Sequence, residues 1–302
     1  MAATPAPPPK LIDHRWALAA LVFGALVIGT TPNLVRLAAC GPAAAGFWRL
    51  ATAAPLLLLA TMAGRPSRGP GLPSRWMLAA GLAFALDLGC WHYGVKFTSI
   101  ANATVLPNLT PVLVTLVSWF VLKEQPKPLF LLGMVAAVGG AVAMALTATP
   151  GATPGAHPHL GDILSVSTAV WYGLYFLCVR SARASHSTMR VMFWSSAAGA
   201  PLLLISALLL HEQILPATSL GWGAAVGLGL AHVFGQGSIA WALGRLPAST
   251  AAVTVLVQPV AAAALAYVLF HEVLTPWQAA GAAVALGGIV LAQRGAAKPA
   301  AA

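Results

Sequence analysis

Ten runs of about 20 mostly apolar residues follow one another along this chain, separated by short connectors. Each helical residue rises about 1.5 Å and the hydrocarbon core of a bilayer is about 30 Å thick, so each run can cross a membrane as a helix. Strands of a β-barrel would instead be segments of about ten residues with alternating polarity. The pattern predicts an all-α integral membrane protein with ten transmembrane helices, at residues 16–36, 43–63, 76–96, 101–122, 129–148, 161–179, 188–210, 220–243, 250–270 and 276–293.

Few residues are available to face water. Only 7% of the 302 residues are charged, whereas soluble domains carry about 25%. This shortage excludes a soluble globular enzyme and a disordered chain. The 16 basic residues behind the net charge of +10 are spread along the chain and form no single stripe, so nucleic acid is not an expected partner. The lipid bilayer is the expected environment, and the sequence leaves the oligomeric state open, a monomer included.

Basic residues are unevenly distributed between the connectors. If the first span starts in the cytoplasm, all of the 16 Lys and Arg residues fall on the cytoplasmic side except Arg36, Arg49 and Lys96. Cytoplasmic connectors of membrane proteins are enriched in Lys and Arg. The distribution therefore predicts a multi-pass protein of a bacterial-type inner membrane with both termini in the cytoplasm.

The two halves of the chain repeat one another. Each half holds five spans, an odd number, so the second copy must enter the membrane upside down relative to the first. Inverted repeats are typical of secondary transporters, which bind their substrates near the midplane between the repeats. Under a shift of 148 residues the matched pairs include Pro111 with Pro259, Glu124 with Glu272 and Gly139-Gly140 with Gly287-Gly288, and under a shift of 146 Phe47-Trp48 matches Phe193-Trp194.

The repeat divides the chain. The expected parts are a disordered cytoplasmic tail (1–13), a first repeat (14–148), an extracytoplasmic linker (149–159), a second repeat (160–294) and a second cytoplasmic tail (295–302).

The repeated segments resemble a known family. TSIANATVLPNLTPVLVTLVSWFVLKE, followed by LLGMVAAVGGAV, and LPASTAAVTVLVQPVAAAALAYVLFHEVLTPWQAAGAAVALGGIV are similar to the paired pattern of ten-helix EamA-type exporters in the drug/metabolite transporter superfamily. The resemblance covers about residues 16–293. It implies a bundle in which spans one to four and six to nine surround a central cavity, with spans five and ten outside. Members of the family export amino acids, drugs, nucleosides and other metabolites, and some relatives import.

Asp87 lies in the middle of the third predicted span. An ionised carboxylate there costs about 2.5–3.5 kcal/mol on insertion scales, so such a residue usually faces a polar cavity or a partner. Asp87 is a candidate for binding a substrate ammonium group and for proton coupling. The alternative is a contact with Arg49 or His232 that joins two helices. Trp91, four residues later, shares the same helix face and is a second binding candidate.

Arg49 is the basic candidate, in the second span. Ser195 occupies the matching place in the other half, whereas an arginine needed only for architecture would be expected in both copies. A guanidinium can bind a carboxylate through two parallel hydrogen bonds. The alternative is that Arg49 extends to the nearby lipid headgroups.

Spans four and nine carry matched prolines beside polar residues. Proline removes a backbone donor and clashes with the carbonyl four residues earlier, so both helices should kink near mid-depth. Pro107, Pro111 and Pro259 are predicted hinges. Asn108 and Gln258 are predicted neutral binding groups. The alternative is that the kinks only shape the bundle.

Two aromatic residues and one histidine complete the candidate site. Trp171 and Tyr175 share a face of span six, where their rings would suit a flat or cationic substrate, although Trp and Tyr also gather at membrane interfaces. His232 is a second proton-coupling candidate if it titrates near neutrality, and a buried structural histidine is the alternative.

These residues predict a secondary transporter that exports small amphiphilic metabolites, amino acids above all and aromatic ones included, by alternating access between the repeats. Its expected partner is a small-molecule substrate. The alternatives are an exporter of drugs or cationic compounds, an importer of the same superfamily and, more remotely, a channel. An intramembrane enzyme would need paired carboxylates, HExxH or a Ser/His pair, and the sequence shows no such set. Without a P-loop pattern or close pairing among Cys40, Cys90 and Cys178, neither a cofactor nor a metal site is expected.

Overall fold

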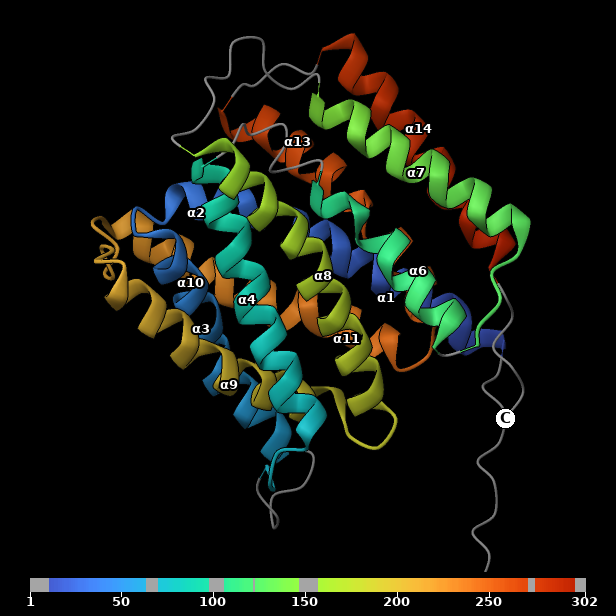
Figure 1. Ribbon diagram of the computed structural model, residues 1–302. Coiled ribbons are helices and arrows are strands. Elements are labelled where there is room, and N and C mark those ends of the chain that lie inside the picture. The colour runs from blue at the N-terminus through green and yellow to red at the C-terminus, as the bar shows by residue number, and fades with distance from the viewer. Residues whose placement is uncertain are drawn as a thin grey trace, which may run out of the picture.

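The computed structural model describes residues 11–63, 70–97, 106–121, 123–146, 157–270 and 275–296, and helices are the only regular elements in these ranges (Figure 1). Over the described residues, each predicted span corresponds to one helix or to two or three consecutive ones, which confirms the all-α prediction. In chain order the spans are α1 (Leu11–Gly29) with α2 (Thr31–Leu37), α3 (Pro42–Ala63), α4 (Arg75–Phe97), η1 (Leu106–Leu109) with α6 (Thr110–Phe120), α7 (Pro128–Leu146), α8 (Pro158–Arg183), α9 (Thr188–Leu209), α10 (Ser219–Ala231) with η2 (His232–Gln236) and α11 (Gly237–Leu243), α12 (Ala248–Thr254) with α13 (Val257–Phe270), and α14 (Pro276–Gly295).

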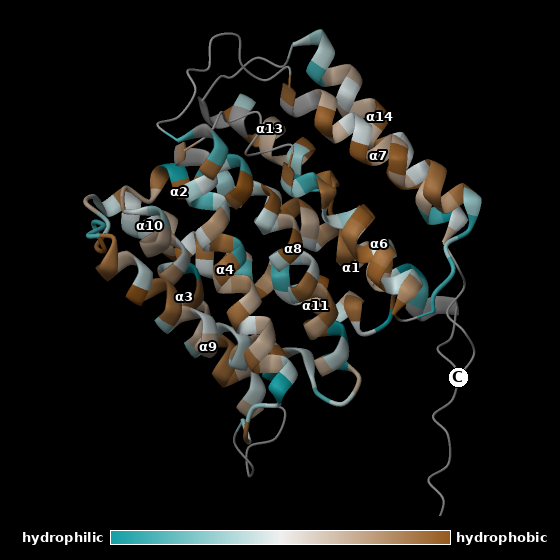
Figure 2. Cartoon of the chain, in the orientation of Figure 1, coloured by the Kyte–Doolittle hydropathy of each residue, from teal (hydrophilic) through white to brown (hydrophobic). Residues whose placement is uncertain are grey.

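The outer surface of the bundle is suited to lipid. Large apolar side chains such as Leu59, Val135 and Leu209 are exposed, and Figure 2 shows hydrophobic residues along the lengths of the helices. A surface of this kind would be an aggregation liability in water. Six helical segments are long and apolar enough to cross a membrane among the described residues: His14–Leu37, Pro42–Ala63, His159–Arg183, Thr188–Leu209, Ser219–Leu243 and Ala248–Leu265. Leu106–Phe120 and Pro128–Ala143 are shorter apolar helices.

Consecutive spans run in opposite directions, so the start of α1 and the end of α14 lie at the same end of the bundle. We call this the terminal end and the other the opposite end. Contacts between sequence-distant segments agree with this arrangement. At the terminal end, the side-chain nitrogen of Gln293 near the end of α14 lies 3.5 Å from the carbonyl oxygen of Thr250 near the start of α12. At the opposite end, the backbone N–H of Gly41 before α3 donates to the carbonyl of Gln213 after α9 at 2.8 Å.

The duplication is visible where α7 and α14 pack together at the side of the bundle (Figure 1). A Cβ added to Gly140 would lie 2.3 Å from the backbone nitrogen of Ala285, and one added to Gly288 would lie 2.3 Å from that of Ala137. The 148-residue shift exchanges these two pairs. The crossing therefore has the two-fold relation that an inverted repeat predicts, and small residues let the backbones approach this closely.

Spans four and nine are interrupted where prolines were predicted to kink them. Pro107 lies in η1, and Pro111 is the second residue of α6. In span nine α12 ends at Thr254, and α13 starts two residues before Pro259. The role of these prolines as hinges stays a prediction. A further interruption between α1 and α2, just before Pro32, was not predicted, although a proline at the start of a helix is its usual signal.

The terminal half of the bundle is filled by side chains. Leu21, Met77 and Leu243 are at most 1% exposed there. Further polar contacts join distant segments at this end. Arg180 forms an ion pair with Glu124, and the Arg190 guanidinium donates to the carbonyl of Leu72 at 2.6 Å. The opposite half of the bundle, by contrast, encloses a cavity.

Candidate functional site

The cavity has a volume of about 370 Å³ and is lined by residues from both repeats. The first repeat contributes residues of α1 to α4, η1 and α6, and the second repeat contributes residues of α8, η2, α12 and α13. The central cavity implied by the resemblance is therefore present. Spans five and ten pack on each other outside it, as expected, but Ala141 of α7 and Gln278 of α14 also reach the lining.

Both charged candidates line this cavity. Asp87 on α4 and Arg49 on α3 are each 7% exposed. The Arg49 guanidinium lies over the Phe84 ring, with 5.1 Å between its central carbon and the ring centroid. Arg49 is therefore turned inward and does not extend to the lipid headgroups.

Asp87 and Arg49 do not neutralise each other by direct contact. Among the residues that the structure describes, the Asp87 carboxylate forms no ion pair or hydrogen bond. The Nε atom of Arg49 is buried without a hydrogen-bond partner in the same part of the chain. The helix-joining ion pair considered for Asp87 is thus not formed. A carboxyl group and a guanidinium thus face one cavity without direct contact.

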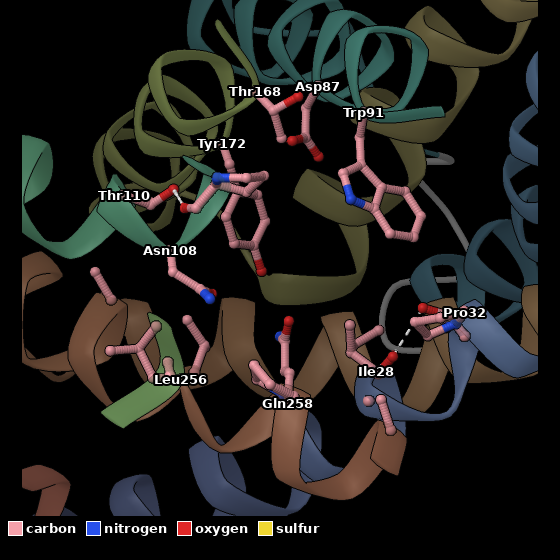
Figure 3. A pocket seen from close by; sticks show the side chains of 18 of the residues that line it. Ile28, Pro32, Asp87, Trp91, Asn108, Thr110, Thr168, Tyr172, Leu256 and Gln258 are labelled. Carbon is pink, nitrogen blue, oxygen red and sulfur yellow. Dashed lines mark hydrogen bonds between the residues drawn. The ribbon is translucent and has the colours of Figure 1, made fainter. Parts of the chain in front are cut away.

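Figure 3 shows how the walls face each other. Asp87 and Trp91 of α4 lie on one wall, and Leu256 and Gln258 lie across the cavity from them. Tyr172 of α8 projects into the space between the two walls. A ligand in this space would contact charged, aromatic and amide groups together.

Neutral amides supply further unused hydrogen-bonding capacity. The side-chain nitrogens of Asn108 and Gln258 are buried without a hydrogen-bond partner among the described residues, and so are both polar side-chain atoms of Gln236. All three residues line the cavity. Because buried polar groups in proteins are nearly always hydrogen-bonded, a cluster of this kind indicates a place where a polar solute binds.

Trp171 and Tyr175 do not belong to the residues that line the cavity, contrary to expectation. Tyr175 is 1% exposed and packs against Phe84, with 4.6 Å between ring centroids. The cavity face of α8 is formed by Thr168 and Tyr172, which have the same four-residue spacing. Neighbouring helical residues point about 100° apart, so the sequence identified the right helix but the wrong face.

His232 lies behind the cavity wall. It is 1% exposed, its Nε2 atom lies 3.0 Å from the Ser196 hydroxyl, and its ring centroid lies 5.4 Å from that of Phe84, which lines the cavity. Its contact with Ser196 fits the structural alternative. Proton coupling by Asp87 or His232 stays a prediction.

Phe84, Thr168 and Gln236 line the cavity but were not predicted as site residues. Thr168 and Phe84 carry no signal in so apolar a sequence. Gln236 did carry a signal, because an amide inside an apolar span needs a hydrogen-bond partner. The direction in which its side chain points, however, depends on the local helix geometry.

Comparisons with known proteins agree with the fold and the cavity. The sequence profile of the EamA-like transporter family matches the chain twice, at residues 15–146 and 159–293. An uncharacterized transporter of Archaeoglobus fulgidus is 26% identical over 288 residues, covering 93% of this chain and 97% of that protein. The pseudopaline exporter CntI of Pseudomonas aeruginosa is 24% identical over 200 residues, or 66% of this chain and 67% of the exporter.

A solved crystal structure has the same fold. It superposes with a TM-score of 0.80 over 94% of this chain and 99% of its own, at 19% identity. The two matched segments together span nearly all of the helical bundle, and each contains one five-span repeat. The chain belongs to the EamA-like transporter family.

Proposed function

We propose that this protein is a secondary transporter that exports small zwitterionic, amphiphilic metabolites, amino acids above all. The observation that carries the proposal is the pair of buried charges, Asp87 and Arg49, that line one cavity without pairing to each other. A substrate ammonium group would satisfy Asp87, and a substrate carboxylate would satisfy Arg49. Both charges would then have a partner in a place where an isolated charge is unfavourable.

The remaining lining suits the body of such a molecule. The rings of Trp91 and Tyr172 offer flat apolar surfaces, and Asn108 and Gln258 offer hydrogen bonds. The cavity volume of about 370 Å³ is near the lower end of the range of about 300–1,000 Å³ for small-molecule sites. These features favour a small metabolite, aromatic amino acids included.

The proposal also includes the direction and the location of transport. A relative named as an exporter supports outward transport. With both termini in the cytoplasm of a bacterial-type inner membrane, the cavity would lie in the extracytoplasmic half of the bundle and the packed terminal half would close the cytoplasmic side. Movement of the repeats would then give alternating access, with the interrupted spans four and nine as hinges.

A transporter of cationic compounds is the second candidate, because Asp87 alone could bind a cation. A purely cationic substrate would place a second positive charge in the cavity that holds Arg49 and would leave the guanidinium without a counter-charge. The pair of charges therefore favours a zwitterion.

Counterflow in proteoliposomes tests the proposal. Vesicles are preloaded with an unlabelled compound, and the same compound in labelled form is added outside. Three compounds are compared: an amino acid, the corresponding amine that lacks the carboxylate, and the corresponding acid that lacks the ammonium group. We expect saturable, accelerated exchange that is fastest for the amino acid. Faster exchange of the amine would support the cation transporter instead, and uptake without acceleration would indicate a channel. Repeating the assay with an imposed pH gradient tests proton coupling.

A further inference from the structure

The eighth span contains a π turn that the matching third span lacks. In η2 the backbone N–H of Gly237 bonds to the carbonyl of His232, five residues earlier. The corresponding residues under the 148-residue shift, 84–88, lie in the uninterrupted helix α4. π turns are rare and are frequently found at functional sites, so this difference between the repeats is a reason to look for a function there.

The π turn is held by close packing against α1. A Cβ added to Gly24 would lie 2.5 Å from the carbonyl oxygen of Gly235, and one added to Gly235 would lie 3.0 Å from the Ile28 side chain. The extra residue of a π turn rotates the residues that follow by about 100° relative to an α-helix. The local geometry therefore decides which way the last residue of η2, Gln236, points.

Gln236 reaches the cavity wall. It is 0% exposed to solvent, and neither its side-chain oxygen nor its nitrogen has a hydrogen-bond partner of normal geometry among the described residues. In the first repeat the matching residue is Leu88, which can form no such bond. Because buried amides are nearly always hydrogen-bonded, an amide in this position has hydrogen-bonding capacity to offer to something that binds in the cavity.

Gln236 and Arg49 share neighbours in the cavity wall. The hydroxyls of Tyr172 and Tyr175 are polar neighbours of the Gln236 amide, and the same two tyrosines interact electrostatically with Arg49. Phe84 also lies between α3 and η2, because its ring contacts both the Arg49 guanidinium of α3 and the His232 ring of η2. Arg49 and Gln236 therefore have aromatic neighbours in common and line the same cavity.

We propose that Gln236 is a substrate-binding residue whose amide N–H donates a hydrogen bond to the same substrate carboxylate that Arg49 binds. The π turn is the element that aims this amide into the cavity. The second repeat thereby contributes a neutral donor to a site whose charges come from the first. This inference rests on the proposed transport of zwitterions and adds a second residue that would recognise their carboxylate.

Two substitutions test the proposal in the counterflow assay. For Gln236→Leu we expect the apparent affinity for an amino acid to fall about tenfold, as for a lost hydrogen bond to a charged group, with that for the corresponding amine unchanged. For Gln236→Glu, a carboxylate facing the substrate carboxylate should abolish amino-acid exchange and preserve that of the amine. The measurement is the ratio of the two apparent affinities.

Gln293→Leu is the matched control. Gln293 bonds to Thr254 and does not line the cavity, so its loss should lower stability and leave the affinity ratio unchanged. If a Gln236 variant weakens the amino acid and the amine equally, or changes neither, the proposal is wrong. Where Gln236→Leu does not fold, the ratio measured for Gln236→Glu decides. If the wild-type protein exchanges the amine and no amino acid, the proposed function has failed, independently of any variant.

Discussion

In the first repeat, α3 and α4 carry Arg49 and Asp87 into the cavity, whereas the matching positions of the second repeat carry Ser195 and Gly235. Ser195 bonds to the carbonyl of Met192 in its own helix, and Gly235 packs against α1. The packing positions of α7 and α14, by contrast, are alike in the two repeats, because the Gly140–Ala285 and Gly288–Ala137 contacts are equivalent. The two repeats therefore have equivalent packing where α7 crosses α14, whereas the charged residues that line the cavity come from the first repeat only.

The largest effect is expected in an experiment that tests whether the second repeat is inverted in the membrane relative to the first. Ala39 and Ser185 are exposed residues in matching connectors, between α2 and α3 at the opposite end and between α8 and α9 at the terminal end. In a variant whose native cysteines are replaced by alanine, Ala39→Cys should react only with an impermeant thiol reagent added outside, and Ser185→Cys only after permeabilisation. Labelling of both from one side would overturn the inverted arrangement.

Removing one charge from the first repeat should have the next largest effect. Truncating one partner of a buried charged contact costs about 2–5 kcal/mol, so Asp87→Asn or Arg49→Gln should weaken amino-acid binding at least about thirtyfold. Counterflow rates and the amount of folded protein in the membrane are measured together. Ser195→Ala, at the matching position of the other repeat, should leave transport near the wild-type rate. Unchanged transport by Asp87→Asn would give that residue a structural role.

The smallest effect concerns the positions that the repeats share. Gly140→Ala and Gly288→Ala each push a Cβ against the facing backbone and should destabilise the protein by similar amounts, about 1–3 kcal/mol. Thermal unfolding in detergent measures this loss. Gly139→Ala and Gly287→Ala are the controls, because no atom lies within 4 Å of a Cβ added there. A loss confined to one member of the Gly140 and Gly288 pair would contradict the symmetry of the crossing.

The fold was predictable because it depends on features that survive in sequence. Runs of apolar residues set the spans, and matched prolines and glycines set the repeat and the interruptions of spans four and nine. Lateral packing needs only small residues at a regular spacing, as at Gly140 and Gly288. Glu272 and its surroundings, the counterpart of Glu124, lie outside the described residues.

The site was predictable only where a residue type was unusual for a membrane span. Asp87, Arg49, Asn108 and Gln258 are polar residues in apolar runs, and all of them line the cavity. The choice between Tyr172 and Tyr175 required the rotation of α8, which an apolar helix surrounded by other helices does not reveal. The direction of Gln236 depends on a π turn that leaves no mark in the sequence.

The crossing of α7 and α14 also has a mechanical consequence. A Cβ added to Gly133, Gly140, Gly288 or Gly295 would lie 2.2–2.3 Å from a backbone nitrogen of the facing helix, and the Gly140 and Gly288 contacts are related by the repeat symmetry. Such close packing opposes sliding of α7 along α14. In the proposed alternating-access cycle, α7 and α14 would therefore keep their relative positions while the helices that line the cavity move around them.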